Sequence, residues 1–160
     1  MAVPEIIPIA YEPDYRTDRI GRFADGQFLA SITYAFPEGY RHGDGLDDAK
    51  CLYVVLHRFD FDGHHIDSDI WCAGTWGEQQ RHRGGPESVV ARAEARMAEL
   101  LDALPGREFQ SIGIRPFGVT VDDVLFGLVI EQHGGNEDDW AELYPDGLGF
   151  CDPWDGEYST

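Results

Sequence analysis

The sequence predicts an α+β domain in which one main helix packs on one face of a largely antiparallel sheet of about five to seven strands. Segments with alternating apolar and polar residues lie both before and after one segment, at about 86–104, whose apolar residues recur every three to four positions. The strict succession of strand and helix that builds parallel sheets is missing. With 160 residues, 42% of them hydrophobic, the chain can form one core. We therefore expect a single domain over residues 1–160.

The first expected hairpin joins residues 19–23 to 27–36 through a turn at Ala24-Asp25-Gly26. Alternation in its second strand places four apolar side chains on one face: Phe28, Ala30, Ile32 and Tyr34. The polar connection that follows, 37–50, has a length typical of functional or mobile loops. Four of its residues could bind a divalent cation, although the same composition is typical of an exposed connection: His42, Asp44, Asp47 and Asp48.

The second expected hairpin spans residues 51–72 around Asp62-Gly63. If these two residues are the centre of a primed turn, counting outward pairs His57 with Ser68, Arg58 with Asp67 and Asp60 with His65. Strand alternation then predicts two faces. The apolar face carries Tyr53, Val55, Phe59, Ile66, Ile70 and Cys72, with His57 and Ser68 among them. The charged face carries Arg58, Asp60, His65, Asp67 and Asp69.

Two kinds of site are conceivable in this hairpin. The histidines and aspartates of residues 60–69 are possible metal ligands, but alternation separates them and Arg58 already faces Asp67. His57 and Ser68 resemble a base and a nucleophile, yet the sequence has no Gly-x-Ser-x-Gly elbow. A buried polar pair is the simpler interpretation of these two residues. We therefore expect no catalytic site, no metal and no cofactor.

The main helix, at about 86–104, is predicted by one apolar stripe: Val90, Ala93, Met97, Leu100, Leu101 and Leu104. Pro86 suits the first helical position and Pro105-Gly106 the end. Residues 109–114 and 121–131 predict two further strands. The second is apolar on both faces, which indicates a central strand covered on both sides.

A short basic segment precedes the helix and is the one concentrated positive patch of the sequence: Arg81, His82, Arg83, Gly84 and Gly85. Helix N-termini attract anions, so this segment could bind an anionic ligand. A solvated loop is the alternative, and the spacing is not that of a P-loop.

The C-terminal segment, about 137–160, predicts a short hairpin around Pro145-Asp146-Gly147 that docks on the domain. Five aromatic residues in it could form a partner-binding surface of the anchor type: Trp140, Tyr144, Phe150, Trp154 and Tyr158. Alternatively, they hold the terminus on its own core.

Acidic residues number 30 against 12 lysines and arginines, which gives a formal charge of −18. This charge repels a phosphate backbone and favours a basic partner, so we expect a protein partner and no nucleic acid. The three cysteines form no Cys-x-x-Cys pair, and the sequence has no secretory signal and no long apolar segment. We therefore expect a cytoplasmic protein that does not enter a membrane.

Three segments carry a family resemblance: GRFADGQFLASITYAFPEGY, LYVVLHRFDFDGHHIDSDIWCAGTW and PWDGEY. They resemble small, mainly actinobacterial proteins labelled formate hydrogenlyase regulatory protein-like. The resemblance implies a cytoplasmic protein with a regulatory role and brings no catalytic motif. The sequence has no cysteine or histidine framework of the kind that a hydrogenlyase component needs to hold metal.

Three functional hypotheses follow. The leading one is a non-catalytic, acidic binding or regulatory module that recognises another protein. The second is an immunity protein, in which negative charge speeds the capture of a basic toxin. The third is a small enzyme or binder that uses Arg81, His82, Arg83 and His42 around an anionic small molecule.

Overall fold

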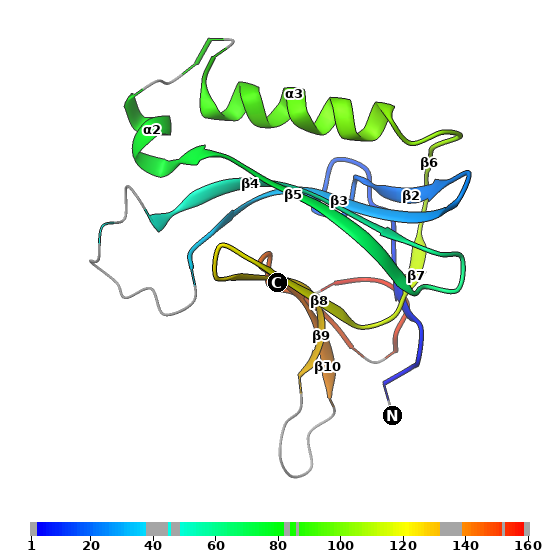
Figure 1. Cartoon of the computed structure of the whole chain (residues 1–160). Coiled ribbons are helices and arrows are strands. Elements are labelled where there is room, and N and C mark those ends of the chain that lie inside the picture. The colour runs from blue at the N-terminus through cyan, green and yellow to red at the C-terminus, as the bar shows by residue number, and fades with distance from the viewer. Residues whose placement is uncertain are drawn as a thin grey trace.

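Two antiparallel sheets face each other, and the main helix covers the outer face of the larger one (Figure 1). The computed structural model describes residues 3–37, 45, 49–81, 84–85, 87–131, 139–151 and 153–158. The larger sheet has five strands in the order β5-β4-β3-β2-β6, the smaller has four in the order β11-β10-β9-β8, and β1 pairs with β7. The predicted α+β class with one main helix is confirmed.

The larger sheet is built from the two predicted hairpins. Its strands are β2 (Ile20–Phe23), β3 (Gly26–Ala35), β4 (Cys51–Phe59), β5 (His65–Thr75) and the short β6 (Glu108–Phe109). Ala24 and Asp25 alone form the first turn, because Phe23 pairs with Gly26. The predicted apolar face of β3 is confirmed for Phe28, Ala30 and Ile32, which pack in the cluster under the helix. Its fourth member, Tyr34, is 36% exposed and lies outside this cluster.

The helix α3 spans Val89–Asp102, and its N-cap is Ser88, whose side chain accepts a hydrogen bond from the Ala91 N–H. The expected start near residue 86 is therefore too early. Val89 is fully buried whereas Val90 is 44% exposed, so the apolar stripe begins one residue before the predicted one. The remaining stripe residues pack on the larger sheet as predicted: Ala93, Met97, Leu100, Leu101 and Leu104. A short helix, α2 (Trp76–Arg81), precedes it.

The smaller sheet comes from the second half of the chain. Its strands are β8 (Phe117–Val121), β9 (Val124–Glu131), β10 (Trp140–Tyr144) and β11 (Leu148–Phe150). β9 is central, as predicted, but it begins only at Val124, after a turn that falls inside the expected strand 121–131. Leu125 is 38% exposed, so the prediction that both faces of this strand are covered is wrong.

Residues 109–114, expected as one strand, divide between two sheets, because β6 pairs with β2 and β7 (Ile112–Ile114) pairs with β1 (Ile7–Ile9). The space between the sheets contains two apolar clusters, and the larger includes Phe59, Leu128 and Phe150. In the described part of the chain, no helix combines the length and the apolar character needed to cross a membrane.

Candidate functional site

The β4–β5 hairpin has the predicted register over most of its length. Arg58 faces Asp67, with Nη1 and Oδ1 2.8 Å apart, and His57 faces Ser68. Near the turn the prediction is wrong. Phe59, not Asp60, is the partner of His65, which lies on the same face as His57 rather than among the charged residues. Ile66, expected in the core, is 55% exposed.

Two local irregularities explain this difference. The Gly63 N–H donates to the Asp60 carbonyl oxygen at 3.1 Å. The Asp60 N–H in turn donates to the His64 carbonyl oxygen at 2.9 Å, which closes the loop. The loop therefore has three residues rather than two, with Gly63 in the left-handed region at φ 89°. A bulge at Ile66 adds the residue that restores the predicted register from Arg58–Asp67 onward.

Ser68 links two histidines between the sheets. Its Oγ lies 2.6 Å from His57 Nδ1 and 2.7 Å from His65 Nε2. Burial, with a smaller contribution from the neighbouring His65, lowers the pKa of His57 to about 3. Burial also lowers the pKa of His65. Both rings are therefore neutral at pH 7, and one donates to the hydroxyl while the other accepts from it.

Two aromatic rings, those of Phe59 and Phe117, pack against both histidines of this histidine–serine cluster, in which His65 and Ser68 are half-buried. The ring of Phe117 stacks on His65 at 4.7 Å and meets the edge of His57 at 4.8 Å. His57 is 2% exposed, which leaves no approach for a substrate carbonyl to the base. The predicted contact between His57 and Ser68 is confirmed, and its geometry is that of buried polar groups satisfying one another.

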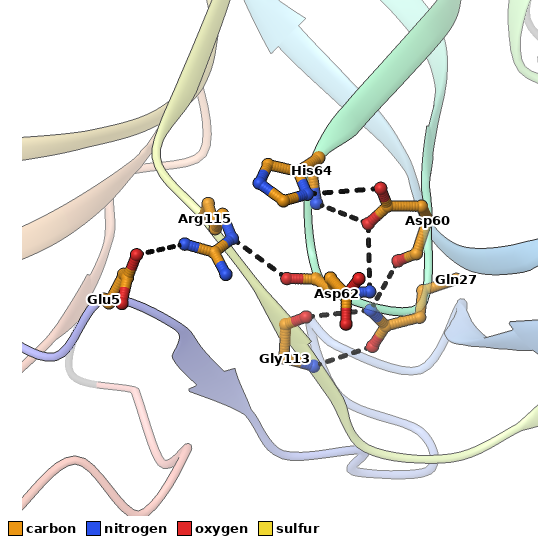
Figure 2. Close-up of polar contacts among 7 residues, drawn as sticks. All are labelled: Glu5, Gln27, Asp60, Asp62, His64, Gly113 and Arg115. Atoms are coloured by element: carbon orange, nitrogen blue, oxygen red, sulfur yellow. Dashed lines mark hydrogen bonds and ion pairs between the residues drawn. The ribbon is translucent and has the colours of Figure 1, made fainter.

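The turn before β5 docks on the strand β7 (Figure 2). Gln27 connects the two, because its side chain bonds to the Asp60 carbonyl oxygen and to both backbone groups of Gly113 at 2.9–3.0 Å. Arg115 donates to the Asp62 carbonyl oxygen at 3.0 Å and pairs with Glu5 at 2.6 Å. A side chain at position 63 would meet the Gly113 oxygen at 2.9 Å, so glycine is required by contact as well as by φ.

Three side chains of this turn could approach one cation: the carboxylates of Asp60 and Asp62 and the His64 ring have atoms within 4.8 Å of one another. Asp60 Oδ1 already accepts the N–H groups of Asp62 and His64, each at 2.9 Å. Its Oδ2 lies 3.2 Å from His64 Nδ1. The His64 N–H bond is the main cause that lowers the pKa of Asp60. These contacts form an aspartate-stabilised turn, and they explain the grouping without a metal.

The predicted anion-binding segment is only partly described. Arg81 ends α2 and is exposed, and Gly84 and Gly85 are exposed at positive φ. His82 and Arg83 lie outside the described residues, as do the possible cation ligands His42, Asp44, Asp47 and Asp48. The Ala91 N–H in the first turn of α3 is satisfied by Ser88, 3.1 Å away, rather than free for an anion.

The C-terminal aromatic residues hold the terminus on the domain. Phe150 is 1% exposed, and Trp154 and Tyr158 pack against the same cluster. The Tyr144 hydroxyl bonds to Glu131 across the smaller sheet, and Trp140 is half-buried. Phe150 is therefore not on the surface, and the other four aromatic residues are half-buried.

A groove between α3 and β5 is not among the sites that the sequence predicts. A cavity of about 460 Å³ is lined by Trp71, Arg92, Ala95, Arg96 and Glu99. The arginines are held by carboxylates: Arg96 lies 3.4 Å from Asp69, and Arg92 pairs with Glu78. The spacing of Arg92 and Arg96 on one helix is the available sequence signal, but the position of Trp71 beside them depends on the packing of the helix.

Comparison with known proteins gives no relative: no family model, no curated protein and no solved structure matches this chain.

Proposed function

We propose that this chain is a non-catalytic module that recognises another protein through a negatively charged surface. One observation carries the proposal. Most of the described arginines already pair with a carboxylate of the chain. Few of them therefore remain to neutralise the other acidic residues, which outnumber lysine and arginine by 30 to 12. The arginines in ion pairs are Arg16, Arg19, Arg58, Arg92, Arg96, Arg107 and Arg115.

The exposed carboxylates lie on many elements. Within the described part of the chain, the following exposed acidic residues form no ion pair: Asp14, Asp25, Asp62, Glu87, Glu108, Asp122, Asp123, Asp155 and Glu157. A surface of this kind attracts basic proteins over distances near the Debye length, about 10 Å at 0.1 M salt, and repels nucleic acids. Acidic charge of this kind mainly speeds association and selects the sign of the partner.

Capture from a cell extract tests the proposal. The purified chain is immobilised, incubated with extract from the organism that produces it, and washed at low and then high salt. We expect a protein with a basic surface to be retained at low salt and released at high salt. Retention of no protein, or of partners insensitive to salt, would contradict electrostatic recognition.

Matched variants connect the capture to the surface. Asp25→Asn, Glu87→Gln and Glu108→Gln together remove three exposed charges, whereas Asp25→Glu, Glu87→Asp and Glu108→Asp keep them. The neutral triple variant should retain the purified partner several-fold more weakly than the charge-conserving one. Equal retention by both triple variants would exclude this part of the surface.

An immunity protein is one specific form of this proposal. It is favoured by the same charge of −18, because fast capture of a basic toxin benefits from electrostatic attraction. The capture experiment distinguishes this form from the general proposal. For an immunity protein, the captured protein would have a toxic activity that the chain abolishes at a one-to-one ratio. A regulatory role, as the family resemblance implies, would leave the partner without such an activity.

A further inference from the structure

We propose that the outer edge of β5 binds an extended, basic segment of the partner protein, which adds to the larger sheet as a further antiparallel strand. The inference rests on the proposed function and specifies its contact surface. β5 is the terminal strand of this sheet, and within the described part of the chain it pairs with β4 alone. An unpaired edge of this kind is a template for strand addition.

The direction of the backbone groups on β5 follows from the register of the sheet. The Ala30 N–H donates to the Arg19 carbonyl oxygen at 2.9 Å, so the backbone groups of Ala30 point away from β4. Successive residues point to opposite sides of a strand, and bonded residues of an antiparallel pair lie directly opposite each other. Leu56 on β4 lies opposite Ala30 without bonding to it, so the backbone groups of Leu56 point toward β5. There they bond to the backbone groups of Asp69, which lies opposite Leu56. The groups that point outward therefore belong to Ser68, Ile70 and Cys72.

Two bulges define the usable length of this edge. The pairing with β4 is regular from Asp67 to Cys72 and shifts register beyond both ends. At about 3.3 Å per residue, this stretch matches a partner segment of about six residues. Bulges at both ends limit continuous sheet growth, which is how natural edge strands avoid unselective pairing. The edge contains neither lysine nor proline within the regular stretch, so the backbone bonds themselves are not blocked.

The side chains on the helix-facing side of β5 determine which segment fits. Asp67 is 57% exposed and Asp69 33% exposed at the side chain, and Trp71, 37% exposed, continues the row. An added strand would place alternate side chains directly opposite these residues. Lysine or arginine fits opposite the two aspartates. An apolar side chain opposite Trp71 would pack on its ring and on Ala95, in a groove that Arg92, Arg96 and Glu99 also line. Each carboxylate has further acceptor capacity beside its own arginine.

The same charges disfavour a second copy of this chain as the occupant. Pairing of two β5 edges would bring the aspartates of both copies close together, and like charges across strands are destabilising. The formal charge of −18 on each chain adds a repulsion between the two copies. A basic segment of another protein meets neither obstacle.

Amide hydrogen exchange with defined peptides tests the inference. The probe is an acetylated, amidated eight-residue peptide in which lysine alternates with valine. Its controls carry glutamate in place of lysine, or N-methyl groups on alternate residues, which block strand pairing and keep the charge. We expect the lysine peptide to slow exchange at Ser68, Ile70 and Cys72 by tenfold or more, and both controls to have little effect. The alternation is the diagnostic feature, because the amides of the intervening residues are already bonded to β4.

Binding of the lysine peptide without this protection would overturn the inference, as would absence of binding or equal binding of the N-methylated control. A pair of variants provides an independent check: Asp67→Asn with Asp69→Asn should weaken binding about tenfold. Glu94→Gln with Asp102→Asn, which changes the net charge equally and likewise removes two carboxylates that pair with arginines, should weaken it by less than about threefold.

The two proposals fail separately. If the extract yields a salt-sensitive basic partner while the peptide fails to bind, the proposed function stands and its location on β5 is wrong. If the peptide protects the β5 amides but the extract yields no protein, the β5 edge stands as a strand-binding site and the proposed function is contradicted.

Discussion

At the scale of single residues, the β4–β5 hairpin shows what can be predicted by counting. The pairs Arg58–Asp67 and His57–Ser68 could be predicted from an Asp-Gly turn and strand alternation. The positions of His65 and Ile66 could not, because loop length and a bulge offset each other by one residue and leave the distant register unchanged. The contact of the turn with Gly113 and Arg115 lies between segments distant in sequence and has no local signal.

Replacing Gly63 with alanine should destabilise the fold more than the same change at Gly147. Both residues have positive φ, which costs about 1–3 kcal/mol for other residues. A side chain at position 63 also meets the backbone of β7 at 2.9 Å, whereas position 147 has nothing within 4 Å. Urea unfolding of both variants measures the difference, and equal losses would show that the contact with β7 is unimportant.

Burial of His57 predicts a pH dependence of stability. Because its folded pKa, about 3, lies below the ordinary value of 6.5, the unfolded chain binds a proton that the folded chain does not. The contribution of neutral His57 to the free energy of unfolding is complete above about pH 6.5. It decreases by up to about 1.4 kcal/mol per pH unit as the pH falls toward 3. The wild type should therefore lose more stability than His57→Gln between pH 6.5 and 4.5. Parallel unfolding curves for the two proteins across this range would contradict the assignment.

At the scale of elements, periodicity locates the helix, while its boundary depends on a cap. The apolar stripe predicts the element, but Pro86 places the expected start too early, and Ser88 caps the helix instead. The choice between Val89 and Val90 as the first core residue is set by the position of the sheet beneath the helix. Propensity carries no information about that position.

Replacing the cap should measure its value. Ser88→Ala removes the acceptor of the Ala91 N–H and should cost about 1 kcal/mol. Ser88→Asp keeps an acceptor and should cost less, with the helix dipole in its favour. Thermal unfolding followed by far-ultraviolet circular dichroism compares the two, and indistinguishable midpoints would show that the cap is energetically irrelevant.

At the scale of the whole molecule, the sequence predicts the fold class but not the division into facing sheets. The turn between β8 and β9 falls inside an expected strand because Asp122 and Asp123 carry no glycine or proline signal, although both lie in the left-handed region that aspartate tolerates. Which strands share a sheet depends on contacts between the first and second halves of the chain. The edge of β5 and its groove follow from that arrangement, so they could not be predicted as a site.

The net charge of the whole chain predicts that salt stabilises it. Repulsion among unpaired carboxylates opposes folding, while each exposed ion pair contributes only about 0–1 kcal/mol. Raising sodium chloride from low concentration to about 0.3 M should therefore raise the unfolding midpoint by a few degrees at pH 7. The Asp25→Asn, Glu87→Gln and Glu108→Gln triple variant should respond less. A midpoint that falls with salt would show that the ion pairs outweigh the repulsion.

Recognition of a basic protein is tested most directly by the affinity of the purified partner at two salt concentrations. Isothermal titration calorimetry at about 0.05 M and 0.3 M sodium chloride covers the range over which exposed charges become screened. Electrostatic recognition predicts that the dissociation constant rises by tenfold or more across this range. An unchanged dissociation constant would contradict it.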